Sequence, residues 1–277
     1  MSFLLRASSF VILVSLFLFS LLSKSMFAQI LFTTFAIISA FFVVYETFSM
    51  LEKINKPGFK ILTSIISAVV ILFMMCFELP QRTFQTGMVF LIIGLWVFLL
   101  FVFENRQQAV DKVVNSLGVF LMVAVPLSFL VLIYRDEPML LLFMVVVTKI
   151  GDTGAYIVGT LSGKLLKGKN HKIVPRISPS KSWEGVFGGL LFSVALSIIL
   201  AGTIFGGKTM IHYPVLLGVV LFFGGFAGDL VESVLKRTCG VKDSGNTIPG
   251  MGGFFDFLDS LLLNAPLFFL YMLYFNV

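Results

Sequence analysis

Long uninterrupted apolar runs, rather than alternating or amphipathic patterns, dominate this chain. Each run is close to the roughly 20 residues that an α-helix needs to cross the hydrocarbon core of a membrane. Their recurrence predicts an all-α, polytopic integral membrane protein with about nine transmembrane helices. The predicted spans are 8–23, 27–49, 61–79, 86–103, 116–134, 138–160, 185–206, 214–235 and 257–275.

Composition supports this class of protein. The 277 residues are 58% hydrophobic and 12% charged, whereas soluble proteins average about 25% charged residues. The first apolar run follows Arg6, as in a signal peptide. Because it is longer than a usual signal h-region and lacks a small-x-small cleavage motif, we expect it to remain as a mature helix.

Basic residues gather in alternate loops between the predicted spans. With the N-terminus placed in the cytoplasm, 15 of the 20 Lys and Arg residues fall on the cytoplasmic side, 4 fall outside, and Lys149 lies within a span. This asymmetry obeys the positive-inside rule. We therefore expect a multi-pass protein of the plasma or inner membrane, with its N-terminus and both long polar loops in the cytoplasm.

The net charge of +6 does not indicate a nucleic-acid partner, because topology accounts for most of the basic residues and no basic domain remains. Anionic lipid headgroups are the expected bulk partner. The two cysteines, Cys76 and Cys239, fall on opposite sides of the membrane in this topology, so we expect no disulfide.

The chain divides into two regions by the placement of its charges. We expect 1–135 to be a scaffold of transmembrane helices, in which Glu46 is interpreted as a snorkelling carboxylate at the membrane interface. We expect 136–277 to be the catalytic region, with cytoplasmic loops 162–183 and 236–256 and an active site at the cytoplasmic ends of the helices.

The sixth predicted span carries Lys149 and Asp152, three residues apart and so on neighbouring faces of one helix. One interpretation is a buried ion pair that fixes helix packing. Gly151, Gly154 and Gly159 allow a ligand or another backbone to approach closely, which favours a polar cavity here.

The loop that follows ends in Ser178, Pro179, Ser180 and Lys181. We expect Ser178 to be the N-cap and Pro179 the first residue of the next helix. Hydroxyls, free N–H groups and Lys181 at a positive helix end would form a phosphate site. Earlier lysines of the loop are interpreted as topology anchors; they are Lys164, Lys167, Lys169 and Lys172.

Acidic and basic residues also follow helical spacing at the end of the eighth span. Asp229, Glu232, Ser233 and Lys236 lie along one stripe, which alone could be a salt-bridged packing surface. The spacing of Asp229 and Glu232 recurs in Asp256 and Asp259, at the inner end of the ninth helix.

Several carboxylates brought together repel one another unless a cation neutralises them. Their hard oxygens favour Mg²⁺ or Ca²⁺ over zinc. Opposite charge stands nearby, in Lys181, Lys236, Arg237 and Lys242. This combination is typical of phosphoryl or nucleotidyl transfer, and it predicts a metal-dependent membrane enzyme that handles phosphate.

At these residues the chain resembles the phosphatidate cytidylyltransferase (CDP-diacylglycerol synthase) family of the bacterial type. The shared signature is Ser233, Lys236-Arg237, Lys242-Asp243, Pro249, Gly252-Gly253, Asp256 and Asp259. The resemblance covers roughly 145–277. Met251 stands where the family usually has His, and Phe257 where it usually has Arg, so no role of those two groups is carried over.

The resemblance implies transfer of a cytidylyl group from CTP to phosphatidate, which gives CDP-diacylglycerol and pyrophosphate. It implies that Asp229, Asp256 and Asp259 hold Mg²⁺ and, with Lys236, form the catalytic group. The substrate-binding residues that it implies are Asp152, Ser178, Lys181, Ser233, Arg237, Lys242 and Asp243. A second, monovalent cation and a homodimer are left open.

Two alternatives stay open on the sequence. One is a CTP-dependent enzyme that acts on another lipid phosphate or a lipid alcohol. The other is an ion-coupled transporter that uses Lys149, Asp152, Asp229 and Glu232 as a charge relay. Charges clustered near one membrane face favour the enzyme, because a transport relay spreads them across the membrane depth.

Overall fold

A computed structural model of the protein describes residues 3–76, 96, 109–204, 212–248, 250 and 252–275. Most of the predicted span 86–103 lies outside these residues, as do Pro249 and Met251. Within the described chain, six helices are long and apolar enough to cross a membrane. They are Met26–Glu52, Ala109–Asp136, Pro138–Leu165, Trp183–Ile204, Tyr213–Thr238 and Phe254–Phe275. The protein is therefore an all-α, multi-pass integral membrane protein.

The chain forms two compact units. The first contains Met1–Arg135 and Cys239–Phe257, and the second contains Asp136–Thr238 and Leu258–Val277. The segment after Thr238, which was predicted to belong to the C-terminal half, thus packs with the N-terminal helices. Both cysteines are free, and burial raises the pKa of the Cys239 thiol.

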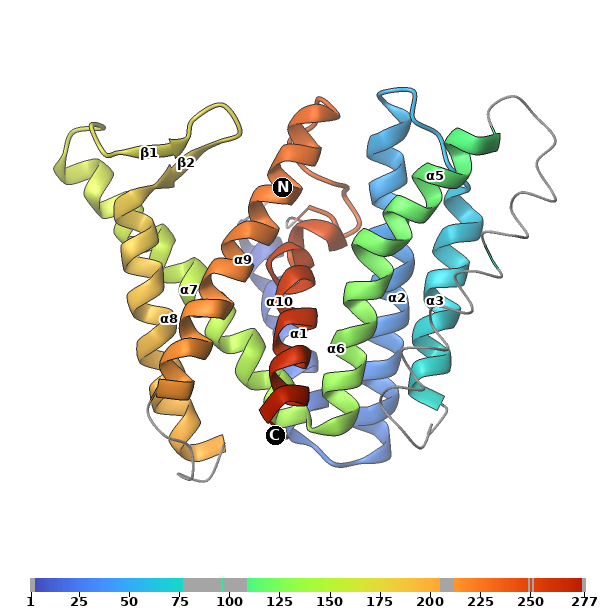
Figure 1. Ribbon diagram of the computed structural model, residues 1–277, viewed down its shortest axis with the longest axis horizontal. Coiled ribbons are helices and arrows are strands. Elements are labelled where there is room, and N and C mark those ends of the chain that lie inside the picture. Colours follow the sequence, from blue (N-terminus) through green and yellow to red (C-terminus); the bar gives the residue numbers. More distant parts are fainter. Residues whose placement is uncertain are drawn as a thin grey trace. The chain divides into compact units, whose positions relative to one another are not determined.

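The helices of the first unit follow the predicted apolar runs (Figure 1). They are α1 (Phe3–Leu22), α2 (Met26–Glu52), α3 (Lys60–Cys76), α5 (Ala109–Val119), the π-helical turn η1 (Phe120–Ala124) and α6 (Val125–Asp136). Ser25 caps α2 by accepting a hydrogen bond from the Ala28 N–H at 3.2 Å. Phe32 stacks on Tyr134 with ring centroids 3.6 Å apart, so α2 and α6 share a core.

The second unit consists of helices and a short hairpin (Figure 1). Its elements are α7 (Pro138–Leu165), β1 (Lys172–Val174), β2 (Ser178–Ser182), α8 (Trp183–Ile204), α9 (His212–Thr238) and most of α10 (Phe254–Phe275). A buried amide joins three of the helices: Asn264 Nδ2 of α10 donates to Thr148 Oγ1 of α7 at 2.7 Å and to the Leu221 carbonyl of α9 at 2.8 Å.

The expectation that a helix begins at Pro179 is wrong. The chain is extended from Ser178 to Ser182 and pairs antiparallel with β1, and α8 begins at Trp183. Proline disfavours the α conformation of the residue before it, which suits an extended Ser178. Ser182 Oγ is the cap, because it accepts a hydrogen bond from the Gly185 N–H at 3.2 Å.

Glycines let α7 and α8 pack backbone to backbone. A Cβ at Gly189 would lie 2.7 Å from the Gly151 carbonyl oxygen, and one at Gly185 would lie 2.8 Å from the Ala155 carbonyl oxygen. Real Cβ atoms essentially never come this close. Small residues therefore set the distance between these two helices.

We expect Gly189→Ala to destabilise the protein by about 1–3 kcal/mol, the usual cost of overpacking. Thermal unfolding of the detergent-solubilised protein measures the loss. Gly202→Ala on the same helix is the matched control, since nothing lies within 4 Å of its added Cβ and alanine favours helix over glycine. Equal melting temperatures for the two variants would contradict the close packing.

Candidate active site

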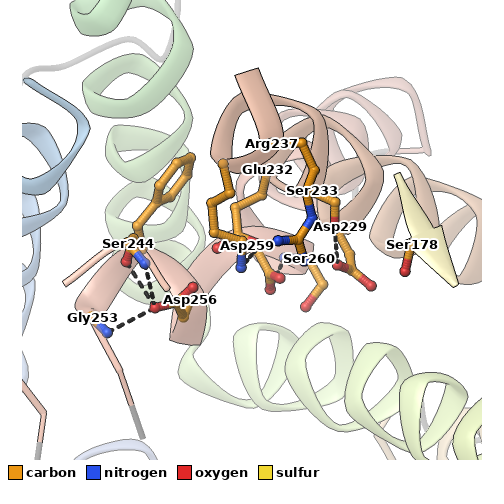
Figure 2. A network of polar contacts seen from close by, with 12 residues as sticks. Ser178, Asp229, Glu232, Ser233, Arg237, Ser244, Gly253, Asp256, Asp259 and Ser260 are labelled. Atoms are coloured by element: carbon orange, nitrogen blue, oxygen red, sulfur yellow. Dashed lines mark hydrogen bonds and ion pairs between the residues drawn. The ribbon is translucent and has the colours of Figure 1, made fainter. Parts of the chain in front are cut away.

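Three carboxylates meet where α9 and α10 pack together. Asp229 and Glu232 lie one turn apart on α9 and Asp259 lies on α10, with one oxygen of each within 4.8 Å of the others. Figure 2 shows the three side chains together. Gly228 permits this approach, because a Cβ there would lie 2.5 Å from the Asp259 carbonyl oxygen. We call Asp229, Glu232 and Asp259 the acidic group.

Each member of the acidic group has a lysine nearby. Lys181 Nζ lies 2.7 Å from Asp229 Oδ2, and Lys236 Nζ lies 2.7 Å from Glu232 Oε2. Lys149 Nζ lies 4.0 Å from Asp259 Oδ1, 3.7 Å from Asp152 Oδ2 and 2.7 Å from Ser260 Oγ. The lysines offset the mutual repulsion of the carboxylates. The donor set consists of hard oxygens and fits Mg²⁺ or Ca²⁺.

A cavity of about 670 Å³ opens beside Asp229 within the second unit. Phe222 and Phe226 of α9 form part of its wall. Its polar lining includes Asp152, Lys164, Asn170, Lys172, Ser178, Ser180, Lys181 and Asp229. The structure thus brings four sequence-predicted site residues to one cavity, namely Asp152, Ser178, Lys181 and Asp229. It also adds Lys164 and Lys172, which were predicted to be topology anchors.

The hairpin that carries Lys181 is anchored at both ends. At its base, the Trp183 N–H donates to the His171 carbonyl at 2.9 Å, and His171 Nδ1 lies 2.8 Å from Glu184 Oε1. At the turn, Arg237 Nε of α9 donates to the Ile177 carbonyl at 3.3 Å. These contacts hold Ser178 and Lys181 over the cavity.

The remaining predicted residues of α9 support the acidic group. Ser233 Oγ donates to Asp229 Oδ1 at 3.4 Å (Figure 2), and Lys236 pairs with Glu232. Lys242 and Asp243 are exposed in the loop after α9, and their predicted roles in binding stay predictions. The same holds for Arg237 as a phosphate ligand.

Asp256 organises the loop before α10. Its Oδ2 accepts hydrogen bonds from the Ser244 N–H at 2.9 Å, Ser244 Oγ at 2.9 Å and the Gly253 N–H at 2.8 Å (Figure 2). Asp256 is the third residue of α10, and Gly253 is the N-cap residue before that helix. A carboxylate at the third position that accepts a hydrogen bond from the N-cap N–H forms one half of a capping box. The predicted metal set of Asp229, Asp256 and Asp259 stays a prediction.

Glu232 is the carboxylate that joins Asp229 and Asp259 in the acidic group, and the predicted metal set did not include it. The sequence signal that could have indicated Glu232 as a member was its position three residues after Asp229, on the same face of one helix. Phe257, where the resembling family has Arg, is half-buried in the first turns of α10.

The expectation that Glu46 snorkels to the membrane interface is wrong. Its side chain is buried, with 3% of the residue exposed, and it is hydrogen-bonded to the loop before α10. No local pattern in the sequence signals this contact, because the partners lie about 200 residues further along the chain.

Fold and site together define a multi-pass membrane protein with a carboxylate site suited to a hard divalent cation. The chain belongs to the Cytidylyltransferase family, whose pattern it matches over residues 4–275.

Curated relatives share part of their length with this chain. A phosphatidate cytidylyltransferase of Mycobacterium bovis is 44% identical over 154 residues, which are 54% of this chain and 48% of that protein. A phosphatidate cytidylyltransferase of Haemophilus influenzae is 39% identical over 150 residues, which are 51% of this chain and 49% of that protein. The uncharacterized protein YnbB of Escherichia coli is 37% identical over 136 residues, which are 49% of this chain and 43% of that protein. The chain thus spans about half the length of the curated relatives it matches.

Proposed function

We propose that the protein transfers a cytidylyl group from CTP to phosphatidate and so forms CDP-diacylglycerol and pyrophosphate. The observation that carries the proposal is the juxtaposition of a lysine-lined cavity with the acidic group. Three lysines line the cavity, and one of them, Lys181, also contacts Asp229. Family membership and the names of the relatives support this choice of nucleotide and lipid.

The cavity residues suit a nucleoside triphosphate. Lys164, Lys172 and Lys181 offer positive charge to the phosphates, and Ser178 and Ser180 offer hydroxyl donors. Asp229, Glu232 and Asp259 would hold Mg²⁺, with Asp256 as the further predicted ligand. Bound there, Mg²⁺ supplies charge neutralisation at the phosphate oxygens.

In the proposed reaction, a phosphate oxygen of phosphatidate forms a bond to the α-phosphorus of CTP. The bond from that phosphorus to the bridging oxygen breaks, and pyrophosphate leaves with the electron pair. The attacking phosphate monoester is already largely a dianion at neutral pH, so no dedicated base is required. Positioning and charge neutralisation by the lysines carry most of the rate.

The proposal includes a setting in the cell. The distribution of Lys and Arg favours a cytoplasmic N-terminus and a site that opens toward cytoplasmic CTP, in the plasma or inner membrane. Phosphatidate would reach the site from the bilayer between the helices. A homodimer and an assisting monovalent cation remain compatible with the proposal.

The test uses purified protein with phosphatidate vesicles, Mg²⁺ and CTP radiolabelled either at the α-phosphate or at the γ-phosphate, because cytidylyl transfer carries the α-phosphate to the lipid whereas phosphorylation of a lipid alcohol carries the γ-phosphate. We expect lipid labelled from the α-phosphate only, and equimolar pyrophosphate. Vesicles that contain diacylglycerol or another lipid phosphate in place of phosphatidate test the two alternative acceptors. Labelled lipid from one of those acceptors alone, or none from any acceptor, would overturn the proposal.

A further inference from the structure

Glu46 is a buried carboxylate of α2 that the proposed chemistry does not use. Burial of a charged group is costly unless it is paired or hydrogen-bonded. Glu46 Oε2 accepts from Ser244 Oγ at 3.1 Å and from the Phe255 N–H at 3.0 Å. Its Oε1 accepts from the Phe254 N–H at 3.1 Å and from Thr247 Oγ1. All four donors belong to the loop before α10 or to the first turn of that helix.

The contact replaces a missing helix cap. The first N–H groups of a helix have no partner inside it, and those of Phe254 and Phe255 open α10. The residue before them, Gly253, has no side chain that could cap the helix. A carboxylate at this end also interacts favourably with the helix dipole. Glu46 therefore supplies from α2 the cap that α10 lacks.

The Glu46 contacts continue into those of Asp256. Ser244 Oγ lies 3.1 Å from Glu46 Oε2 and 2.9 Å from Asp256 Oδ2. Because a hydroxyl carries one proton, Ser244 donates to one of these carboxylates at a time. The Ser244 N–H and the Gly253 N–H also donate to Asp256 (Figure 2). Both carboxylates thus bind the same loop, and displacing Glu46 would remove the hydrogen bonds to the Phe254 and Phe255 N–H groups, which fix the backbone beside Asp256.

The loop is shaped to fit this carboxylate. A Cβ at Gly245 would lie 2.8 Å from Glu46 Oε1, and one at Gly253 would overlap Glu46 Oε2 and Ser244 Oγ. Phe254 also stacks on Phe42 of α2, with ring centroids 5.6 Å apart. Close glycine backbone and aromatic packing thus bring the loop next to α2, within hydrogen-bonding distance of Glu46.

We propose that Glu46 is a positioning residue for the reaction. It fixes the described residues of the loop before α10, namely 244–248, 250, 252 and 253, together with the start of that helix, and through them Asp256. The catalytic part of this inference rests on the proposed function. The N-terminal helices are then not only a membrane scaffold, because α2 holds the loop that carries part of the signature.

The test compares Glu46→Gln with wild type and with Glu52→Gln. Glutamine keeps the shape but turns one acceptor oxygen into an NH₂ group that faces N–H and O–H donors. We expect kcat to fall about 10- to 100-fold, as a displaced catalytic group would cause, with a smaller change in the KM for CTP. We also expect amide hydrogen exchange at residues 253–256 to accelerate about tenfold, the equivalent of one lost hydrogen bond.

Glu52→Gln is the matched control. It makes the same change on the same helix, but Glu52 is half exposed and pairs only at the surface with Lys60, at 2.9 Å. Exposed pairs contribute little to stability, so its kinetics and exchange should equal those of wild type. Thr247→Val, which removes one donor to Glu46 at constant size, should shift both readouts in the same direction by less. If Glu46→Gln does not fold, Thr247→Val alone tests whether the contacts of Glu46 position the loop.

Unchanged exchange at 253–256 in these variants would overturn the positioning role. So would faster exchange with a kcat equal to that of Glu52→Gln, because the loop would then be ordered without consequence for the reaction. If wild-type protein formed no labelled lipid, the proposed function would fail, and the exchange measurements alone would still decide whether Glu46 orders the loop.

Discussion

Asp259→Asn should lower kcat/KM for CTP about 10²- to 10³-fold, the loss expected when one preorganised charge is removed from a transition-state site. Asp259 is only 13% exposed, and it faces Asp229 and Glu232 with oxygens within 4.8 Å. Asparagine has nearly the same shape but no charge. The loss would therefore report the charge of the acidic group rather than its packing.

Two measurements separate this effect from misfolding. The first is the labelled-lipid assay, with Asp111→Asn as control, since Asp111 is an exposed carboxylate of the first turn of α5. The second is thermal unfolding with and without Mg²⁺. A ligand that binds only the folded state raises its stability, so Mg²⁺ should stabilise wild type and Asp111→Asn more than Asp259→Asn. Equal stabilisation of all three proteins would remove Asp259 from the metal site.

The fold class could be predicted from the sequence because apolar runs long enough to span a membrane rarely occur in soluble proteins. Predicted runs such as 27–49 and 138–160 correspond to α2 and α7. The ends of the helices were harder to predict from the sequence. Helix α8 begins at Trp183 because the preceding residues pair with β1 in a hairpin, and a strand of five residues is too short to leave a clear periodic signal.

The acidic group was predictable in part. Helical spacing placed Asp229 and Glu232 on one stripe, but only the packing of α9 against α10 decides which carboxylates meet. That packing depends on Gly228, and glycine is common enough in transmembrane helices that its position alone does not indicate a close contact. The contacts of Asp256 with Ser244 likewise depend on loop geometry that spacing alone does not specify.

Lysines were the hardest residues to interpret. The positive-inside rule alone was enough to predict Lys164 and Lys172 as topology anchors of a cytoplasmic loop. The hairpin packs against α7 and α8, which brings Lys172 of β1 to the cavity lining beside Lys164 of the last turn of α7. Glu46 illustrates the same limit, because a buried carboxylate and an interfacial one look identical until the partner loop is known.

Lys181→Met should reduce kcat/KM for CTP about 10- to 100-fold, in line with the roughly 1.5–3 kcal/mol typical of hydrogen bonds to charged groups. Lys181 stands between the cavity and the acidic group: its Nζ lies 2.7 Å from Asp229 Oδ2 and 4.2 Å from the centroid of the Phe226 ring. Methionine keeps the apolar stem against that ring and removes the charge. Asp229 then loses its ion pair, and the triphosphate loses a cation.

Lys169→Met is the matched control, because it removes the same charge from the same loop at an exposed position outside the cavity lining. If bulk electrostatic attraction alone brought CTP to the protein, both variants would lose affinity equally, and both losses would vanish at high salt. A specific site predicts a loss confined to Lys181→Met that persists at high salt, because a partly buried pair is screened weakly. Lys181→Arg should recover only part of the activity, since a planar guanidinium does not replace a compact ammonium group.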